Sequence, residues 1–168
     1  MKLLPIENIV FKTKLKEDEV IKRLSNSVEP QKKSWSAIFG AGSIKPYEGQ
    51  IYSNTFDISR NINYRNSFLP QINGVIEQGY DGTTIKVKMR LHVLVIVFLC
   101  VWCSIVGGPC LNILTQALTD NLVFQPMSLI PLGMLIFMYG ITMGGFKYES
   151  SKAKKYLKVL FEADIVGE

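Results

Sequence analysis

The chain has 168 residues, a net charge of +5 and a hydrophobic content of 48%, which suits a single small domain or such a domain joined to a membrane hairpin. It contains one histidine and three cysteines, and no glycine-rich phosphate loop, Ser-His-Asp set or paired-carboxylate motif occurs in it. These observations argue against an enzyme and against a metal or cofactor site, and the mild, dispersed basic excess does not predict nucleic-acid binding.

The N-terminal part predicts a strand followed by a helix. Apolar and polar residues alternate from Ile6 to Leu15, which is the period of a half-buried strand. From Lys16 the apolar residues recur at helical spacing, with three acids in the first turn, and the helix should end before Pro30. No continuous apolar stretch of signal-peptide length precedes these elements, so we expect the N-terminus to stay in the cytoplasm.

An antiparallel meander should follow a loop at residues 31–46, in which a short strand is expected near 35–39. Alternating runs separated by turn residues indicate its four strands, at residues 47–53, 55–62, 69–78 and 83–89. The tetrad Gly79-Tyr80-Asp81-Gly82 supplies a hairpin turn between the last two strands.

The next segment is almost free of charge: between Leu91 and Phe146 the single charged residue is Asp120. A membrane-spanning helix needs about 20 mostly apolar residues. Residues 89–111 and 127–146 meet this requirement, so we expect a transmembrane helical hairpin at 91–146, with Asp120 in its external connector. Lysine and arginine flank both spans and are missing from the connector, which predicts that both termini lie in the cytoplasm and that the connector lies outside.

After the hairpin, residues 147–163 return to helical spacing, with an apolar stripe that must cover another surface. The exposed face of the meander is the surface available. We therefore expect an α+β cytoplasmic domain of strand, helix, antiparallel meander and C-terminal helix. This domain is discontinuous, formed by residues 1–90 and 147–168, with the two-helix hairpin inserted between its last strand and its last helix.

Two resemblances accompany this organisation. The run Tyr64-Arg65-Asn66-Ser67-Phe68-Leu69-Pro70, followed by Lys88-Met89-Arg90-Leu91-His92, resembles a family of small, uncharacterised bacterial membrane proteins with two spans. This resemblance implies the same layout and no particular activity. The order of strands and helices is also similar to the helix-grip fold of START and polyketide-cyclase domains, which bind ligands, although the chain has fewer strands.

The densest polar cluster of the soluble part predicts a ligand or partner contact, formed by Arg60, Tyr64, Arg65 and Asn66. Loops held by a rigid sheet often carry binding residues, and an arginine there can grip a phosphate or carboxylate. The alternative is that the asparagines only form turns and Arg65 is solvated. Arg60 stands on the apolar face of its strand and needs a partner, for which we consider Asp57 or Glu77.

Small residues predict how the two spans pack together. They form one stripe at Cys103, Gly107 and Cys110 and another at Gly133, Gly140 and Gly144, and such stripes let helix backbones approach closely in lipid. We expect the two stripes to face each other within the hairpin, and homodimerisation through the second span is the alternative. The Cys100-Val101-Trp102-Cys103 spacing is better explained by this packing than by redox or zinc chemistry.

The sequence thus predicts a membrane-anchored cytoplasmic binding module that recognises a partner protein or a lipid-like ligand at the inner membrane surface. The competing class is a structural or immunity-type membrane subunit that acts through its hairpin. A ligand binder of helix-grip type should have an apolar cavity between the meander and the C-terminal helix.

Overall fold

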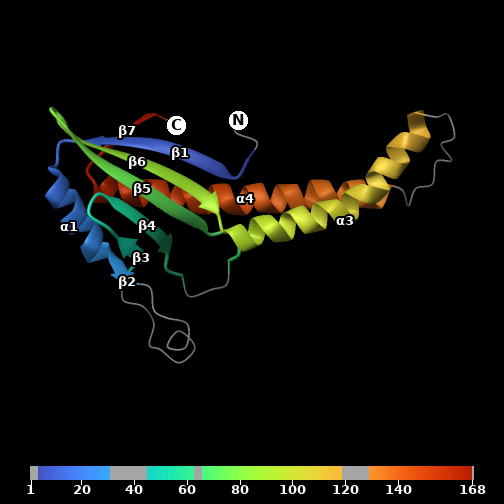
Figure 1. Cartoon of the computed structure of the whole chain (residues 1–168), viewed down its shortest axis with the longest axis horizontal. Coiled ribbons are helices and arrows are strands. Elements are labelled where there is room, and N and C mark those ends of the chain that lie inside the picture. The colour runs from blue at the N-terminus through green and yellow to red at the C-terminus, as the bar shows by residue number, and fades with distance from the viewer. Residues whose placement is uncertain (1–3, 31–44, 63–65, 119–128, 168) are drawn as a thin grey trace, which may run out of the picture.

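The computed structural model describes residues 4–30, 45–62, 66–118 and 129–167, and these form an α+β fold with a seven-stranded sheet and three helices (Figure 1). The strands are β1 (Ile6–Thr13), β2 (Val28–Pro30), β3 (Tyr47–Ile51), β4 (Thr55–Arg60), β5 (Pro70–Gly79), β6 (Gly82–Leu91) and β7 (Asp164–Gly167). The helices are α1 (Glu17–Ser27), α3 (Val93–Leu118) and α4 (Leu129–Leu160).

The sheet has the strand order β2-β3-β4-β5-β6-β1-β7, in which β2 and β3 are parallel and all other neighbours are antiparallel. The first predicted strand and the four-stranded meander are confirmed, and β1 adds to the meander beside β6. The two edge strands, β2 and β7, were not predicted from the sequence. The strand expected near 35–39 lies outside the described residues.

The predicted hairpin turn joins β5 to β6, where Gly79 pairs with Gly82. Gly82 has a φ of +125°. A Cβ at this position would lie 2.2 Å from the carbonyl oxygen of Thr13 on the neighbouring strand. Only glycine avoids both the backbone strain and this clash, so Gly82 allows β1 to pack against the start of β6.

The core lies between the inner face of the sheet and the helices α1 and α4. Alternate residues of the strands point into it and are almost fully buried, among them Phe11, Phe56, Ile72, Ile85 and Met89. The predicted stripe of the C-terminal helix is confirmed, because its members Ala153, Leu157 and Phe161 are fully buried against these strands. Large side chains therefore fill the space between the sheet and α4 in the described part of the chain.

The second predicted span and the C-terminal helix are one continuous helix, α4, of 32 residues. No proline interrupts the sequence between Leu132 and Leu160, so the hydrogen-bond ladder continues from the apolar half into the half that covers the sheet. The helix ends where Glu162 adopts a left-handed φ of 46° and the amides of Glu162 and Ala163 donate to Val159 and Lys158. This pattern is a Schellman motif, which satisfies the last carbonyl groups and turns the chain into β7.

The first predicted span is shifted relative to the sequence prediction. Met89 and Leu91 belong to β6 and are buried in the core, and the helix α3 begins only at Val93. His92 caps this helix, since its Nδ1 accepts a hydrogen bond from the amide of Leu94 at 3.2 Å. The sheet and the apolar helix are consequently separated by a single residue.

The helix α3 and the apolar half of α4 lie side by side and extend away from the sheet (Figure 1). Both helices are long and apolar enough to cross a membrane. Their large apolar side chains are mostly exposed, for example Leu94, Ile105 and Phe137 at 72%, 67% and 70%. Water is an unfavourable surrounding for so large an apolar surface.

Candidate functional site

A buried ion pair connects α4 to the sheet. The side chain of Glu149 on α4 is only 1% exposed, and one of its oxygens lies 2.7 Å from Nη1 of Arg60 at the end of β4. Its other oxygen accepts a hydrogen bond of 3.3 Å from Nδ2 of Asn66, in the turn before β5. Asn66 is oriented in turn by the amide of Phe68, which donates to its Oδ1 at 3.0 Å. We call Arg60, Asn66 and Glu149 the Glu149 cluster.

The partners considered for Arg60 in the sequence analysis are wrong. Arg60 shares a strand face with Phe56 and Ile58, and that face points toward α4. Asp57 alternates to the opposite face and is exposed, while Glu77 pairs with Lys86 at 2.7 Å. The helix that covers the inner face supplies the partner of Arg60, which is Glu149.

Tyr47 extends the polar surroundings of the cluster. It begins β3 and pairs in register with Arg60. Its side chain is buried, and its ring centroid lies 5.0 Å from that of Tyr156 on α4. Burial is the main reason why the pKa of Tyr47 is raised well above its usual value, and the charge of Arg60 opposes this rise. The phenol therefore stays neutral through the physiological range.

Removal of the Tyr47 phenol should change how the stability of the fold depends on pH in the alkaline range. Above the ordinary tyrosine pKa of about 10, the unfolded chain releases a proton that folded Tyr47 retains, so stability falls as the pH rises. Tyr47→Phe should make this fall shallower between about pH 10 and 11.5, with little effect at pH 7. Urea unfolding at a series of pH values measures it. The fully exposed Tyr80 provides the control, because Tyr80→Phe should leave the slope unchanged.

The structure describes only part of the predicted contact cluster. Tyr64 and Arg65 lie outside the described residues, whereas Arg60 and Asn66 are brought together by Glu149. Sequence reasoning missed Glu149, although a signal was present. It stands three residues after Phe146 and four before Ala153, on the buried stripe of α4, where a carboxylate needs a partner.

Further contacts on the same face of the sheet hold α4 against β1. Lys154 Nζ lies 3.2 Å from a carboxylate oxygen of Glu7 on β1, an ion pair without hydrogen-bond geometry. Thr13, also on β1, donates from its hydroxyl group to the carbonyl oxygen of Phe161 at 2.7 Å. Together with the Glu149 cluster, these contacts fix the helix on β4 and β1.

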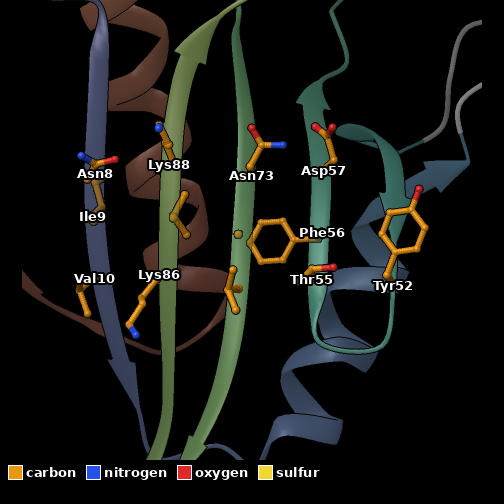
Figure 2. Close-up of a pocket in the computed structure, with 13 residues that line it drawn as sticks. Asn8, Ile9, Val10, Tyr52, Thr55, Phe56, Asp57, Asn73, Lys86 and Lys88 are labelled. Atoms are coloured by element: carbon orange, nitrogen blue, oxygen red, sulfur yellow. The ribbon is translucent and has the colours of Figure 1, made fainter.

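The opposite face of the sheet, which we call the outer face, carries a shallow hollow of about 570 Å³. Figure 2 shows its side chains in two rows across β1, β6, β5 and β4, with the helices behind the sheet. One row consists of Asn8, Lys88, Asn73 and Asp57, which are direct neighbours in the strand register. The second row consists of Val10, Lys86, Val75 and Thr55, and Tyr52 stands at its end.

The small-residue stripes do not form the contact between α3 and α4. A Cβ on Gly107, Gly133, Gly140 or Gly144 would have no atom within 4 Å, and Cys103 is exposed, while Cys110 is partly exposed. Bulkier side chains, including Val106 and Met143, are buried along these helices instead. The expected close approach at the glycines is therefore absent within the single chain.

The cysteines carry no metal site in the described part of the chain. All three are free, and no group of three or more histidine, cysteine or acidic side chains comes together there. Asp120, in the connector, lies outside the described residues.

No known protein family matches the chain, and neither a curated protein nor a solved structure matches it. The interpretation of function therefore rests on the chain's own geometry.

Proposed function

We propose that the chain is a membrane-anchored binding module, whose domain lies on the cytoplasmic side of a bacterial inner membrane and recognises a partner protein or a lipid-like ligand. The recognition surface in this proposal is the outer face of the sheet. The observation that carries it is the contrast between the two faces: the inner face is filled by α1 and α4, whereas the outer face is open and hollowed.

The exposed apolar helices support the membrane anchor. α3 has 26 residues and would be about 39 Å long, enough to cross a hydrocarbon core of about 30 Å. Transfer of its exposed leucine, valine and phenylalanine side chains from water into lipid is favourable. Lys86, Lys88 and Arg90 precede α3 and Lys147 follows the apolar half of α4, which favours a cytoplasmic domain formed by residues 1–90 and 147–168.

Because α4 is continuous, the anchor would also fix the orientation of the sheet above the bilayer. The same helix that would cross the membrane is bound to β4 through Glu149 and to β1 through Lys154. A hinge between span and domain is missing, since the helix continues without a break from Leu129 to Leu160. The sheet would therefore be held at one orientation above the bilayer, with its outer face open to the cytoplasm.

The packed interior favours the outer face as the place where a ligand binds. A helix-grip ligand binder would hold its ligand between the sheet and the long helix, but fully buried side chains such as Phe146 and Phe161 occupy that space. The outer face offers a hollow within the range of about 300–1,000 Å³ that small-molecule sites have.

The second function, a structural or immunity-type subunit that acts through its hairpin, is favoured by one observation. Gly140 and Gly144 have open space where a partner backbone could approach. In that case the contacts would be made within the membrane and the outer face would stay free.

Photo-crosslinking in intact membranes tests the proposal. A benzophenone amino acid in place of Val75 samples the outer face, in place of Lys22 it samples the exposed side of α1, and in place of Ile105 it samples α3. We expect a discrete adduct from Val75 and none from Lys22, detected by the mass of the intact protein. An adduct from Ile105 alone would support the subunit function, and the absence of any adduct from Val75 would contradict our proposal.

A further inference from the structure

We infer that the outer-face hollow binds an amphipathic anion from the aqueous phase, that is, a phosphate or carboxylate attached to a small apolar body. This inference rests on the proposed function and narrows its ligand class. It follows from three features of the hollow. The hollow has a set of free donors, it has an apolar floor beside them, and the donors lie nearer to α3 than the floor does.

The donors come from three adjacent strands. Lys88 on β6 pairs in register with Asn8 on β1 and with Asn73 on β5, so the Cβ atoms of neighbouring residues are about 5 Å apart. Figure 2 shows all three side chains on the same face of the sheet. In the described part of the chain, none of them makes a hydrogen bond or an ion pair. An ammonium group between two amides can donate to several oxygens of one anion.

The charges around the hollow restrict where that anion can bind. Lys86 is neutralised by Glu77, whose carboxylate lies 2.7 Å away, so the uncompensated positive charge of the hollow is that of Lys88. Asp57 ends the same row on β4 and repels an anion from that side. The anionic group should therefore lie over Lys88, between β1 and β5.

The floor next to these donors is apolar. Val10 and Val75 stand in the second row, on either side of Lys86, and the ring of Tyr52 lies at the end of that row (Figure 2). Val75 and Tyr52 are 38% and 58% exposed, which leaves their apolar surface in water in the free protein. Burial of this surface by an apolar body would favour binding. A simple inorganic anion would leave it uncovered.

The order of the rows favours a ligand from solution over a bilayer lipid. β6 runs toward α3, so Lys88 stands nearer to α3 than the apolar row around Lys86 does. Lys88 precedes Val93 by five residues, which corresponds to about 16 Å along a strand. A lipid anchored in the bilayer with its headgroup on Lys88 would direct its chains toward α3, away from Val10 and Val75. A soluble amphiphile can cover both rows.

Calorimetric titration of the full-length chain in nanodiscs of zwitterionic phosphatidylcholine tests the inference, with hexyl phosphate as the probe and empty nanodiscs as the blank. We expect saturable binding of hexyl phosphate that Lys88→Gln weakens tenfold or more and that Asn73→Asp abolishes. Lys12→Gln is the matched control, because Lys12 is an exposed lysine on the same face but outside the hollow, and it should leave the affinity unchanged. Val75→Asn should weaken the binding of hexyl phosphate and leave the response to inorganic phosphate unchanged.

Equal affinity of the unmodified chain and the Lys88→Gln variant would overturn the inference, and so would binding of inorganic phosphate as tight as that of hexyl phosphate. Displacement of hexyl phosphate by phosphatidylglycerol built into the nanodisc would show that a bilayer headgroup reaches Lys88, which contradicts a soluble ligand. If hexyl phosphate fails to bind while Val75 still forms a crosslinked adduct in membranes, the ligand class is wrong and the proposed recognition surface stands. Loss of both results would remove the proposed function as well.

Discussion

Replacement of Arg60 by methionine is expected to lower the free energy of unfolding of the domain by about 3–5 kcal/mol, the largest effect of any single substitution in the Glu149 cluster. Glu149 is 1% exposed and would be left as a buried carboxylate without its guanidinium partner, while the amide of Asn66 still donates to it. Methionine keeps most of the aliphatic length of arginine, so the loss of charge rather than of volume dominates. Urea unfolding in mild detergent, followed by far-UV circular dichroism, measures the change.

A second substitution separates the ion pair from the packing around it. In the variant that carries both Arg60→Met and Glu149→Met, the buried carboxylate is removed together with its guanidinium partner, and most of the lost stability should return. Arg90→Met is the matched control, since Arg90 is exposed and its loss should change the stability by less than about 0.5 kcal/mol. If the double variant is no more stable than the Arg60 variant, the loss of the guanidinium partner of Glu149 is not the cause.

Replacement of Gly74 by alanine is expected to destabilise the domain by about 2 kcal/mol, even though alanine is ordinarily the better residue in a strand. A Cβ on Gly74 would lie 2.0 Å from Cζ of Phe56, the residue opposite it on β4. Phe56 has little room to move, because it is 2% exposed and its ring packs near that of Phe161. The same unfolding measurement reports the effect.

Two further variants test whether the contact between the new Cβ and Phe56 causes this loss of stability. Gly133→Ala adds a Cβ where no atom lies within 4 Å, so it should not destabilise the chain. In the Gly74→Ala background, Phe56→Leu should recover part of the loss, because the shorter side chain leaves the space that the new methyl group needs. A Gly74→Ala variant as stable as the unmodified chain would show that the core around Phe56 can rearrange.

Most of the sheet could be predicted from the sequence because its strands are long and strictly alternating. In β6 the inward residues Ile85, Val87 and Met89 are all apolar, and the outward residues between them are charged. The edge strands lack such a pattern, since β2 has three residues and β7 has four. Their pairing depends on neighbours distant in the chain, such as Tyr47 for β2, which periodicity cannot show.

The candidate site was predictable only in part. From the sequence, Arg60 and Asn66 are expected to contact a ligand or partner, whereas the structure places both against Glu149, which comes from a helix 83 residues further along the chain than Asn66. Its position could be inferred only by placing α4 on the sheet. The outer-face hollow was missed for a different reason. Asn8, Asn73 and Asp57 look like ordinary solvated strand residues until the register puts them in one row with Lys88.

The glycines of the two spans illustrate where a local motif misleads. The Gly140 and Gly144 spacing permits a close helix contact, yet it does not choose the partner helix. In the single chain the neighbour of α4 is α3, whose position is set by β6 and by core contacts of Val95 and Leu99 near its start. This anchoring at the sheet determines how the helices meet, and the glycines remain open.

In the proposed function, the sheet stands on the cytoplasmic side of a membrane that α3 and α4 cross. Labelling of single cysteines with a membrane-impermeant maleimide tests it most directly, in a background where Cys100, Cys103 and Cys110 are replaced by alanine. Asn121→Cys, in the connector between the spans, should react in intact cells, whereas Tyr80→Cys, in the fully exposed turn of the sheet, should react only after lysis. Reaction of Tyr80→Cys in intact cells, or of neither position before lysis, would contradict this account.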